Sequence, residues 1–317
     1  MTYFVDAIKD DMPYLATYDI HFWSRTGMLY EGFADAWGDF ALVHVNPAYA
    51  SLAIEMQKAW GEFWIENLFR GVQKCALKVR KGEVSNFSSC VPWLLMELKR
   101  FASSENVSEV YSREVPVTPV KAFDRGAQKG RVIVVYGTHN PDPSGTEYDK
   151  KTAEKIANNL RIFYSLWRDK VEVEVRADDE VTSSELNENL VIVGGPVANS
   201  LAEKMQNHFP FQFRKTGGRW YLWRNESWKG EWEIVSFLLM NSTIKRGYLV
   251  SLNDVALIAS IRNPYNPENY IVWIAGTNRS LTALFQNPTY YLSSYELWSK
   301  NGIEMGFYVQ PLTHRLS

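Results

Sequence analysis

The second half of the chain alternates short apolar runs with longer amphipathic stretches, and this alternation constrains the fold more than any other feature. Residues 131–136 read RVIVVY and predict a buried strand, while residues 149–167 place apolar side chains at helical spacing with charged side chains between them. Further strands are predicted at 171–175 and 190–193. Strands that alternate with helices in this way are typical of a parallel sheet covered by helices.

Two short motifs predict helix starts on either side of the third strand. Residues 182–185 and 200–203 both match the capping-box pattern, in which a hydroxyl and a carboxylate satisfy free backbone amides. The resulting order of strands and helices is the beginning of a doubly wound, flavodoxin-like sheet. After residue 210 the sequence favours strands, at 255–261 and 270–274 among others, so we expect a β-rich extension of this unit.

The first half shows a less regular alternation. Strands are predicted at 13–20 (PYLATYDI) and 40–45 (FALVHV), and helices at 28–37, from residue 47 onward and at 92–100. This pattern also indicates an α/β unit.

The stretch at 103–129 separates the two halves. It loses the periodicity and contains prolines and glycines among polar residues, which indicates a domain boundary. We therefore expect two α/β units, at 1–125 and 126–317, each with three layers and a mostly parallel sheet, and the second flavodoxin-like with a β-rich C-terminal part.

The composition disfavours several classes of function. The 317 residues are 46% hydrophobic and 22% charged, which is typical of a globular protein. The formal net charge is −2 and no run is dense in Lys and Arg, which argues against nucleic-acid binding. No apolar run is long enough for a transmembrane helix, and the first residues do not read as a signal peptide, so a cytoplasmic location stays open.

Cys75 and Cys90 are the two cysteines of the chain. They form either one disulfide or two buried thiols, and the thiols are the favoured interpretation. Neither has a second Cys or His at ligand spacing, so no metal site is predicted. Cys90 precedes a predicted helix, where the pKa of a thiol can be lowered, and is therefore a candidate catalytic thiol.

The loop at 137–146 leads from a buried strand into a helix, a position where backbone amides bind phosphate. The ligand predicted for this loop is FMN or phosphate, and FMN is the only cofactor that the sequence suggests. Pro141 and Pro143 argue against it, because they have no N–H to donate. The candidate ligand-binding residues of this loop are Thr138, His139, Ser144, Gly145 and Thr146.

Gly194 and Gly195 end the strand at 190–193, at the edge where open α/β sheets hold ligands. Glycine there is equally explained by a tight turn, with Pro196 beginning the connection to the next helix. Both interpretations stand, and the turn is favoured.

Aromatic residues make up 14% of the chain and cluster at 220–232. Aromatic rings have apolar faces that can stack on sugar rings, and a hairpin would hold them rigidly. Because alternate residues of a strand point to opposite faces, about half of these rings are expected in the core. The candidate glycan-binding residues are Trp220, Trp223 and Trp228.

The second half resembles a known module in three segments. VIVVYGT (132–138), VRADDEVTSSELNENLVIVGGPVAN (175–199) and IRNPYNPENYIVWIAGTN (261–278) occur in this order, with a helix between the first two. Together, over residues 132–278, they are similar to the C-terminal α/β module of secreted prolyl-oligopeptidase or esterase-type proteins and to archaeal S-layer-like surface proteins. The resemblance implies an extracellular or cell-surface location and a module that does not carry the hydrolase triad.

Residues 13–80 resemble the closing part of a gingipain-type, caspase-like cysteine peptidase domain, from PYLATYDI through FALVHVNP to RGVQKCAL. In that family the first of these strands ends at the catalytic Cys. Here it ends at Asp19, Ile20 and His21, without a Cys. The resemblance therefore implies a degenerate or truncated peptidase, with Asp19 and His21 as the titratable pair at the vestigial site.

These observations give one leading hypothesis and two alternatives. The leading hypothesis is a non-catalytic secreted or cell-surface module that contributes protein or glycan interactions. The alternatives are a hydrolase, in the form of a degenerate peptidase or esterase, and a flavodoxin-like binder of FMN or phosphate. Five N-x-S/T sequons agree with export but do not decide it.

Overall fold

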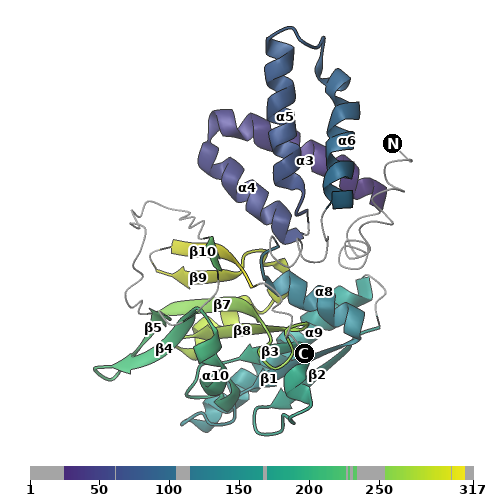
Figure 1. Ribbon diagram of the computed structural model, residues 1–317. Coiled ribbons are helices and arrows are strands. Elements are labelled where there is room, and N and C mark those ends of the chain that lie inside the picture. The colour runs from purple at the N-terminus through teal and green to yellow at the C-terminus, as the bar shows by residue number, and fades with distance from the viewer. Residues whose placement is uncertain are drawn as a thin grey trace. The chain divides into compact units, whose positions relative to one another are not determined.

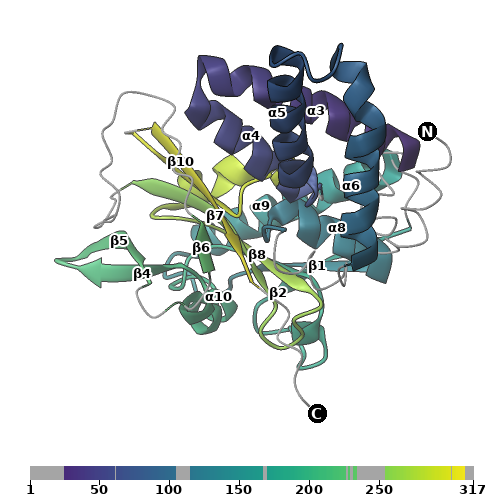
Figure 2. The ribbon, with the colours of Figure 1, turned by 45° about the horizontal axis from the view of Figure 1, so that its top comes forward.

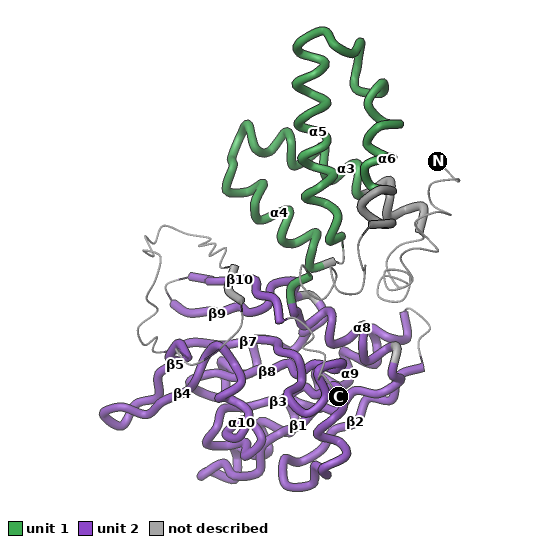
Figure 3. The backbone as a smooth tube through the Cα atoms, in the orientation of Figure 1, with its two compact units in different colours: residues 1–116, 311–317 green, residues 117–310 purple. Residues whose placement is uncertain are grey.

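The computed structural model describes residues 25–60, 62–104, 115–166, 170–225, 228, 231–233, 254–300 and 302–310. The chain divides into two compact units, coloured separately in Figure 3. Unit 1 comprises residues 1–116 and 311–317, and unit 2 comprises residues 117–310.

Helix α8 (Pro119–Lys129) lies in unit 2, within the stretch at 103–129 for which a boundary without periodicity is predicted. The Thr118 hydroxyl caps its first turn by accepting the Lys121 amide at 3.3 Å, and Gly130 ends it in the left-handed region at φ 77°. Of the prolines and glycines that suggested a loop, Pro119 and Gly130 therefore stand at the two ends of a helix, where each is favoured, and Gly126 lies within it.

The described part of unit 1 consists of helices, visible in Figure 1. This part shows no strand, so the prediction of a three-layer α/β unit is corrected for it. The strand predicted at 13–20 lies outside the described residues. The helices are α3 (Arg25–Val45), α4 (Pro47–Trp60), α5 (Ile65–Arg80), η1 (Phe87–Cys90) and α6 (Val91–Ser104).

The strand predicted at Phe40–Val45 is wrong, because these residues form the last turns of α3. Phe33, Ala36, Phe40 and Val43 follow each other at spacings of three and four residues, and all pack into one hydrophobic cluster of unit 1. A short apolar run does not reveal its own period, and here the neighbouring residues supply a helical one.

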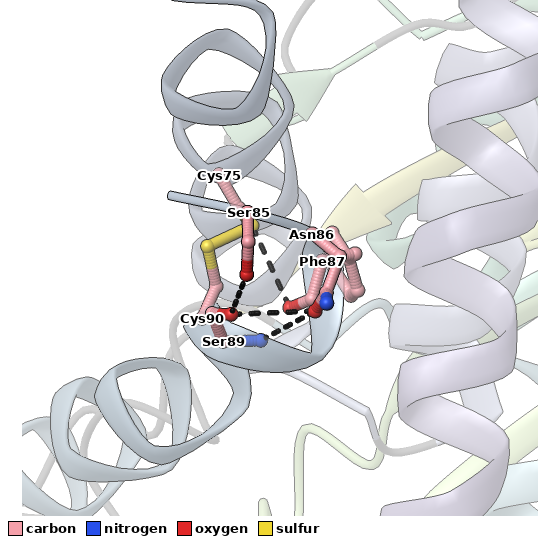
Figure 4. Close-up of a disulfide and its surroundings, with 6 residues drawn as sticks. All are labelled: Cys75, Ser85, Asn86, Phe87, Ser89 and Cys90. Carbon is pink, nitrogen blue, oxygen red and sulfur yellow. Dashed lines mark hydrogen bonds between the residues drawn. A yellow bond between two sulfur atoms is a disulfide. The ribbon is translucent and has the colours of Figure 1, made fainter. Parts of the chain in front are cut away.

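Cys75 of α5 and Cys90 of η1 form a disulfide, so the interpretation as two buried thiols was wrong (Figure 4). Their Cα atoms are 6.0 Å apart, and both side chains are buried beside Leu94 of α6. The side chain of Asn86 caps η1 by accepting the Ser89 amide at 3.2 Å. The bond joins α5 to the start of α6, and it removes Cys90 as a candidate catalytic thiol.

Unit 2 is built on one eight-stranded mixed sheet. Its strands lie in the order β2 (Glu172–Ala177), β1 (Arg131–Tyr136), β3 (Leu190–Val193), β8 (Tyr270–Gly276), β7 (Val255–Arg262), β9 (Tyr295–Ser299), β10 (Gly302–Val309) and β6 (Glu231–Glu233). Pairing is parallel from β2 to β8 and antiparallel from β8 to β6. The central strands are buried on both faces, which explains their continuous apolar runs.

The α/β class is confirmed for this unit, and its first strands lie in the order 2-1-3 that begins a flavodoxin-like sheet. The next position is occupied by β8, which follows the antiparallel strand β7 in the chain. The β-rich extension therefore continues the same sheet, and a complete flavodoxin-like order is not present among the described strands.

The two faces of the sheet have different covers, as Figures 1 and 2 show. Helices α8 and α9 (Pro143–Leu166) lie on one face, and on that side Trp298 of β9 packs against Phe285 with ring centroids 5.1 Å apart. Helix α10 (Ser200–Met205) and the hairpin of β4 (Phe211–Thr216) and β5 (Arg219–Arg224) lie on the other. There Phe213 of the hairpin packs against Trp273 of β8 at 5.4 Å.

A two-residue turn joins β4 to β5. Its residues Gly217 and Gly218 both have positive φ, at 58° and 80°. A hairpin turn of this kind needs left-handed backbone at both positions, which glycine adopts without strain. The turn fixes the register of the hairpin, in which Lys215 lies opposite Trp220 and Phe213 opposite Leu222.

Candidate functional site

The loops that follow β1, β3 and β8 meet at the carboxyl edge of the parallel strands, beside the β4–β5 hairpin. They enclose a cleft of about 290 Å³. Open α/β sheets bind ligands at this edge, where the strand order reverses around the first strand. Each loop contributes to the wall: Asn140 comes from the first, Gly194 and Gly195 from the second, and Arg279 from the third, while Trp220 comes from the hairpin.

Asp149 is the buried acid of the cleft. It stands in the second turn of α9, and its residue is 3% exposed. Burial raises the pKa of this carboxyl to about 6, against the opposing effects of a hydrogen bond from Asn140 and the charge of Arg279. The Asn140 amide donates to Oδ2 of Asp149 at 3.3 Å. A carboxyl that titrates near neutral pH inside a cleft is a common property of functional sites.

Arg279, at the start of α11 (Arg279–Thr282), ties the third loop to the first. Its Nη2 lies 2.7 Å from Oδ2 of Asp142, and its Nη1 donates to the Ser144 hydroxyl at 3.0 Å. Hydrogen bonds from Ser144 and Arg279 lower the pKa of Asp142 to about 2. The guanidinium is thus already engaged by a carboxylate and a hydroxyl.

Gly194 and Gly195 form a turn and also line the cleft, while ligand binding by this segment stays a prediction. Gly194 has φ 106°, its amide donates to the Ile274 carbonyl at 2.9 Å, and its carbonyl accepts from Nε1 of Trp273 at 3.0 Å. The Gly195 carbonyl accepts the amides of Ala198 and Asn199 at 3.1 and 3.0 Å. The turn is fixed at both ends and has no side chain to fill the cleft.

Asn199, and not Ser200, caps helix α10. Its Oδ1 accepts the amides of Leu201 and Ala202, each at 3.0 Å, which corrects the predicted capping box at 200–203. Its Nδ2 donates to the carbonyls of Val135 and Val193 at 3.2 and 3.0 Å, so this buried amide also joins the ends of β1 and β3. The predicted cap lies one residue after the observed one, because Asn caps a helix as well as Ser does and Asn199 directly precedes Ser200.

The other predicted capping box is confirmed. The Thr182 amide donates to Oε2 of Glu185 at 2.9 Å, and the Glu185 amide donates to the Thr182 hydroxyl at 3.3 Å. This reciprocal pair begins the short helix η2 (Glu185–Asn187).

Asp178, directly after β2, holds the first and second loops together. Its Oδ1 accepts the amide and hydroxyl of Thr138 at 2.9 and 2.7 Å, and its Oδ2 accepts the Ser200 amide at 2.5 Å. Burial alone would raise the pKa of Asp178, but these hydrogen bonds lower it. Nε2 of His139 lies 3.6 Å from the same carboxylate.

The loop residues predicted to bind phosphate therefore have other surroundings. Thr138 and His139 face Asp178, and Ser144 bonds Asp142 and Arg279. None of Thr138, His139, Ser144, Gly145 and Thr146 lines the cleft, whereas Gly194 and Gly195 do. A Cβ on Gly145 would lie 2.5 Å from Cγ of Asn140, so glycine there lets the Asn140 side chain turn back toward Asp149.

The three candidate tryptophans do not form one platform. Trp220 is half-buried and lines the cleft. Trp223 lies on the opposite face of the hairpin, where the Arg214 guanidinium stands 5.8 Å from its ring centroid. Trp228 is buried against Tyr308 with ring centroids 4.9 Å apart.

The proposed acid–base pair Asp19 and His21 lies outside the described residues. Within the part of the chain that the structure describes, no three His, Cys, Asp or Glu side chains gather as a metal site would require.

Several residues of the site were not identified from the sequence. Asp149 stands four and seven residues before Ala153 and Ile156 on the buried stripe of α9, and an acid on an apolar stripe was the signal that could have identified it. Asn140, Asp142, Asp178 and Arg279 lie in loops or at element ends, and no periodicity indicates their role.

Comparison with known proteins gives one finding. Residues 170–285 match the model of a family described as the S-layer like family, outer domain. The matched segment extends from β2 to η4 (Ala283–Phe285) and includes Asp178, the Gly194–Asn199 turn and Arg279. No curated protein matches the chain.

The match supports the S-layer-like part of the resemblance. The likeness to prolyl-oligopeptidase modules and to gingipain-type domains stays a prediction. Among the helices that the structure describes, none has the length and apolar character that a membrane crossing needs.

Proposed function

We propose that this chain is part of an exported, surface-associated protein and acts by binding other surface components without catalysing a reaction. The observation that carries the proposal is the match of residues 170–285 to an S-layer-like outer domain. The matched segment contains most of the sheet of unit 2 and two of the three loops around the cleft.

The Cys75–Cys90 disulfide supports export independently, because it lies in unit 1 and outside the matched residues. Disulfides form and persist in oxidising compartments, whereas thiols of the cytosol are kept reduced. A structural disulfide and a match to a surface family thus point to the same location through unrelated properties of the chain.

Labelling of intact cells of the source organism with a membrane-impermeant, amine-reactive biotin reagent tests the location. Exposed lysines such as Lys151, whose side chain is 70% exposed, are expected to be labelled without lysis. A known cytosolic protein in the same sample serves as the control. Labelling that occurs only after the cells are lysed would refute the proposal.

Purified protein separates the alternatives. A hydrolase would turn over peptide or ester substrates and would lose that turnover on His21→Ala, whereas a flavodoxin-like protein would be yellow or would quench added FMN. The proposal expects neither behaviour, and either result would replace it.

A further inference from the structure

We infer that the cleft between the loops after β1, β3 and β8 binds one neutral sugar residue of a glycan, with the Trp220 ring against the sugar and Asp149 accepting a hydroxyl. The inference names a ligand for the surface protein proposed above. It is argued from the geometry and charge of the cleft, so its failure would leave the proposed location standing.

One wall of the cleft is aromatic. Trp220 lies on the same face of the hairpin as Phe213, and both residues line the cleft. Phe213 is fixed by its contact with Trp273, while Trp220 is half-buried and packs on the edge of the core. A ring that is held in place but still accessible offers a flat apolar surface, which the C–H face of a sugar ring can cover.

Another part of the cleft wall is polar and incompletely satisfied. In the described part of the chain, one hydrogen bond reaches the Asp149 carboxylate, from the Asn140 amide. An ionised carboxylate has about four acceptor positions, and a buried polar group with free capacity is unusual unless a ligand or water fills it. Sugar hydroxyls are donors of the required kind.

The charges of the cleft favour a neutral ligand. An anion such as phosphate would meet Asp149, while the nearby cation Arg279 is already bonded to Asp142 and Ser144. A cation stacked on Trp220 would meet the Lys215 ammonium, which stands 6.0 Å from the centre of that ring. An anion or a cation would therefore meet a like charge in the cleft. A neutral polyol with an apolar face can interact with both the aromatic and the polar part of the wall.

The size of the cleft agrees with a single ring. Pockets for drug-sized ligands begin at about 300 Å³, and this cleft measures about 290 Å³. Gly195 contributes to that space, because a Cβ placed on it would have one atom within 4 Å, the Gly276 carbonyl oxygen at 3.9 Å. Because a Cβ meets no close contact there, a larger side chain at this position is expected to extend into the cleft.

Saturation-transfer NMR on the full chain tests the inference. The probes are the methyl glycosides of glucose, galactose, mannose and N-acetylglucosamine, with inorganic phosphate as the anionic comparison. At least one glycoside is expected to bind, with the strongest saturation at the ring protons that face Trp220. Trp220→Ala should weaken binding by about tenfold or more, because it removes the aromatic wall.

Matched variants separate loss of the site from loss of the fold. Trp223→Ala removes a ring from the other face of the same hairpin and should bind as the unmodified chain does. Gly195→Leu should abolish binding by filling the cleft, whereas Gly195→Ala should retain it. Melting curves identify any variant that does not fold; if Trp220→Ala is one, the Gly195 pair decides.

Three results would overturn the inference. They are no saturation of any glycoside, saturation that survives both Trp220→Ala and Gly195→Leu, and binding of phosphate in preference to the glycosides. The last would restore the phosphate alternative.

Discussion

Replacing Asp149 by Asn should make the protein more stable at neutral pH. The carboxyl is buried, and burial raises its pKa from 3.8 to about 6. Ionised Asp149 therefore destabilises the folded chain above that pH. Asn has the same shape and can still bond Asn140, but it has no charge to bury.

The size of the effect follows from the pKa. At about 1.4 kcal/mol per pKa unit, the rise corresponds to about 3 kcal/mol of lost unfolding free energy at pH 7 and above. The loss is absent below pH 3.8, where the carboxyl is protonated in both states, grows as the pH rises toward 6, and is then constant. The pKa of about 6 already includes the hydrogen bond from Asn140 and the charge of Arg279, so a gain of up to about 3 kcal/mol is expected for the neutral side chain.

Urea unfolding at pH 7.5 and at pH 4 measures this gain. The advantage of Asp149→Asn should approach about 3 kcal/mol at about pH 7.5 and fall below about 1 kcal/mol at about pH 4, because the raised pKa leaves little charge to remove in acid. Glu147→Gln, on the exposed side of the same helix, should change stability by less than about 0.5 kcal/mol at both pH values. An Asp149→Asn variant that is less stable than the original chain at neutral pH would show that the acid is structural, and the reasoning would fail.

Three further substitutions test other parts of the account. Cys75→Ser should lower the unfolding free energy of unit 1 by about 3 kcal/mol, because the bond closes a loop with a sequence separation of 15 residues; calorimetry with and without reductant measures this, and equal melting of the two proteins would contradict it. Gly137→Ala should unfold the β1 end of unit 2, because its Cβ would lie 2.0 Å from the Ala198 carbonyl oxygen. The control Gly195→Ala should melt as the original chain does, and a Gly137→Ala variant that folds would refute the close approach. Asn199→Ala should lower the free energy of unfolding by about 2–4 kcal/mol, because it leaves buried groups without hydrogen-bond partners. Asn278→Ala, at the exposed cap of α11, should lower it by about 1 kcal/mol. Similar urea midpoints for the two variants would count against the role given to Asn199.

The buried strands could be predicted from the sequence because their environment leaves a direct trace in it. RVIVVY is β1 at Arg131–Tyr136 and LVIV is β3 at Leu190–Val193, both within their predicted limits. Strands that are covered on both faces need apolar side chains at every position. The order of the strands in the sheet has no such signal in the sequence. The position of β8, which pairs with β3 and forms a hairpin with β7, was therefore not predicted.

The first half shows where pattern reasoning fails. FALVHV has the composition of a strand, and the helical spacing of Phe33, Ala36, Phe40 and Val43 appears only when a longer window is read. Helix α8 was not predicted for a related reason. Pro119 and Gly130 are typical of loops, but they also favour the first position and the end of a helix, which is where they stand.

The candidate site was predicted in part. Gly194 and Gly195 were identified because glycine at the end of a buried strand is a local signal. Asp149, Arg279 and Trp220 come from segments far apart in the chain, and the fold alone brings them to one cleft. Trp220 was a candidate from the aromatic cluster at 220–232 alone. The chemistry of Asp149 becomes visible only when burial is known, because its raised pKa is caused by its surroundings.

The most direct test of the account is the position of a sugar in a crystal of this protein. Crystals soaked in turn with the methyl glycosides of glucose, galactose, mannose and N-acetylglucosamine should show one ring stacked on Trp220, with a hydroxyl within hydrogen-bond distance of Asp149. An empty cleft in every soak, or sugar density seated only elsewhere on the surface, would contradict it.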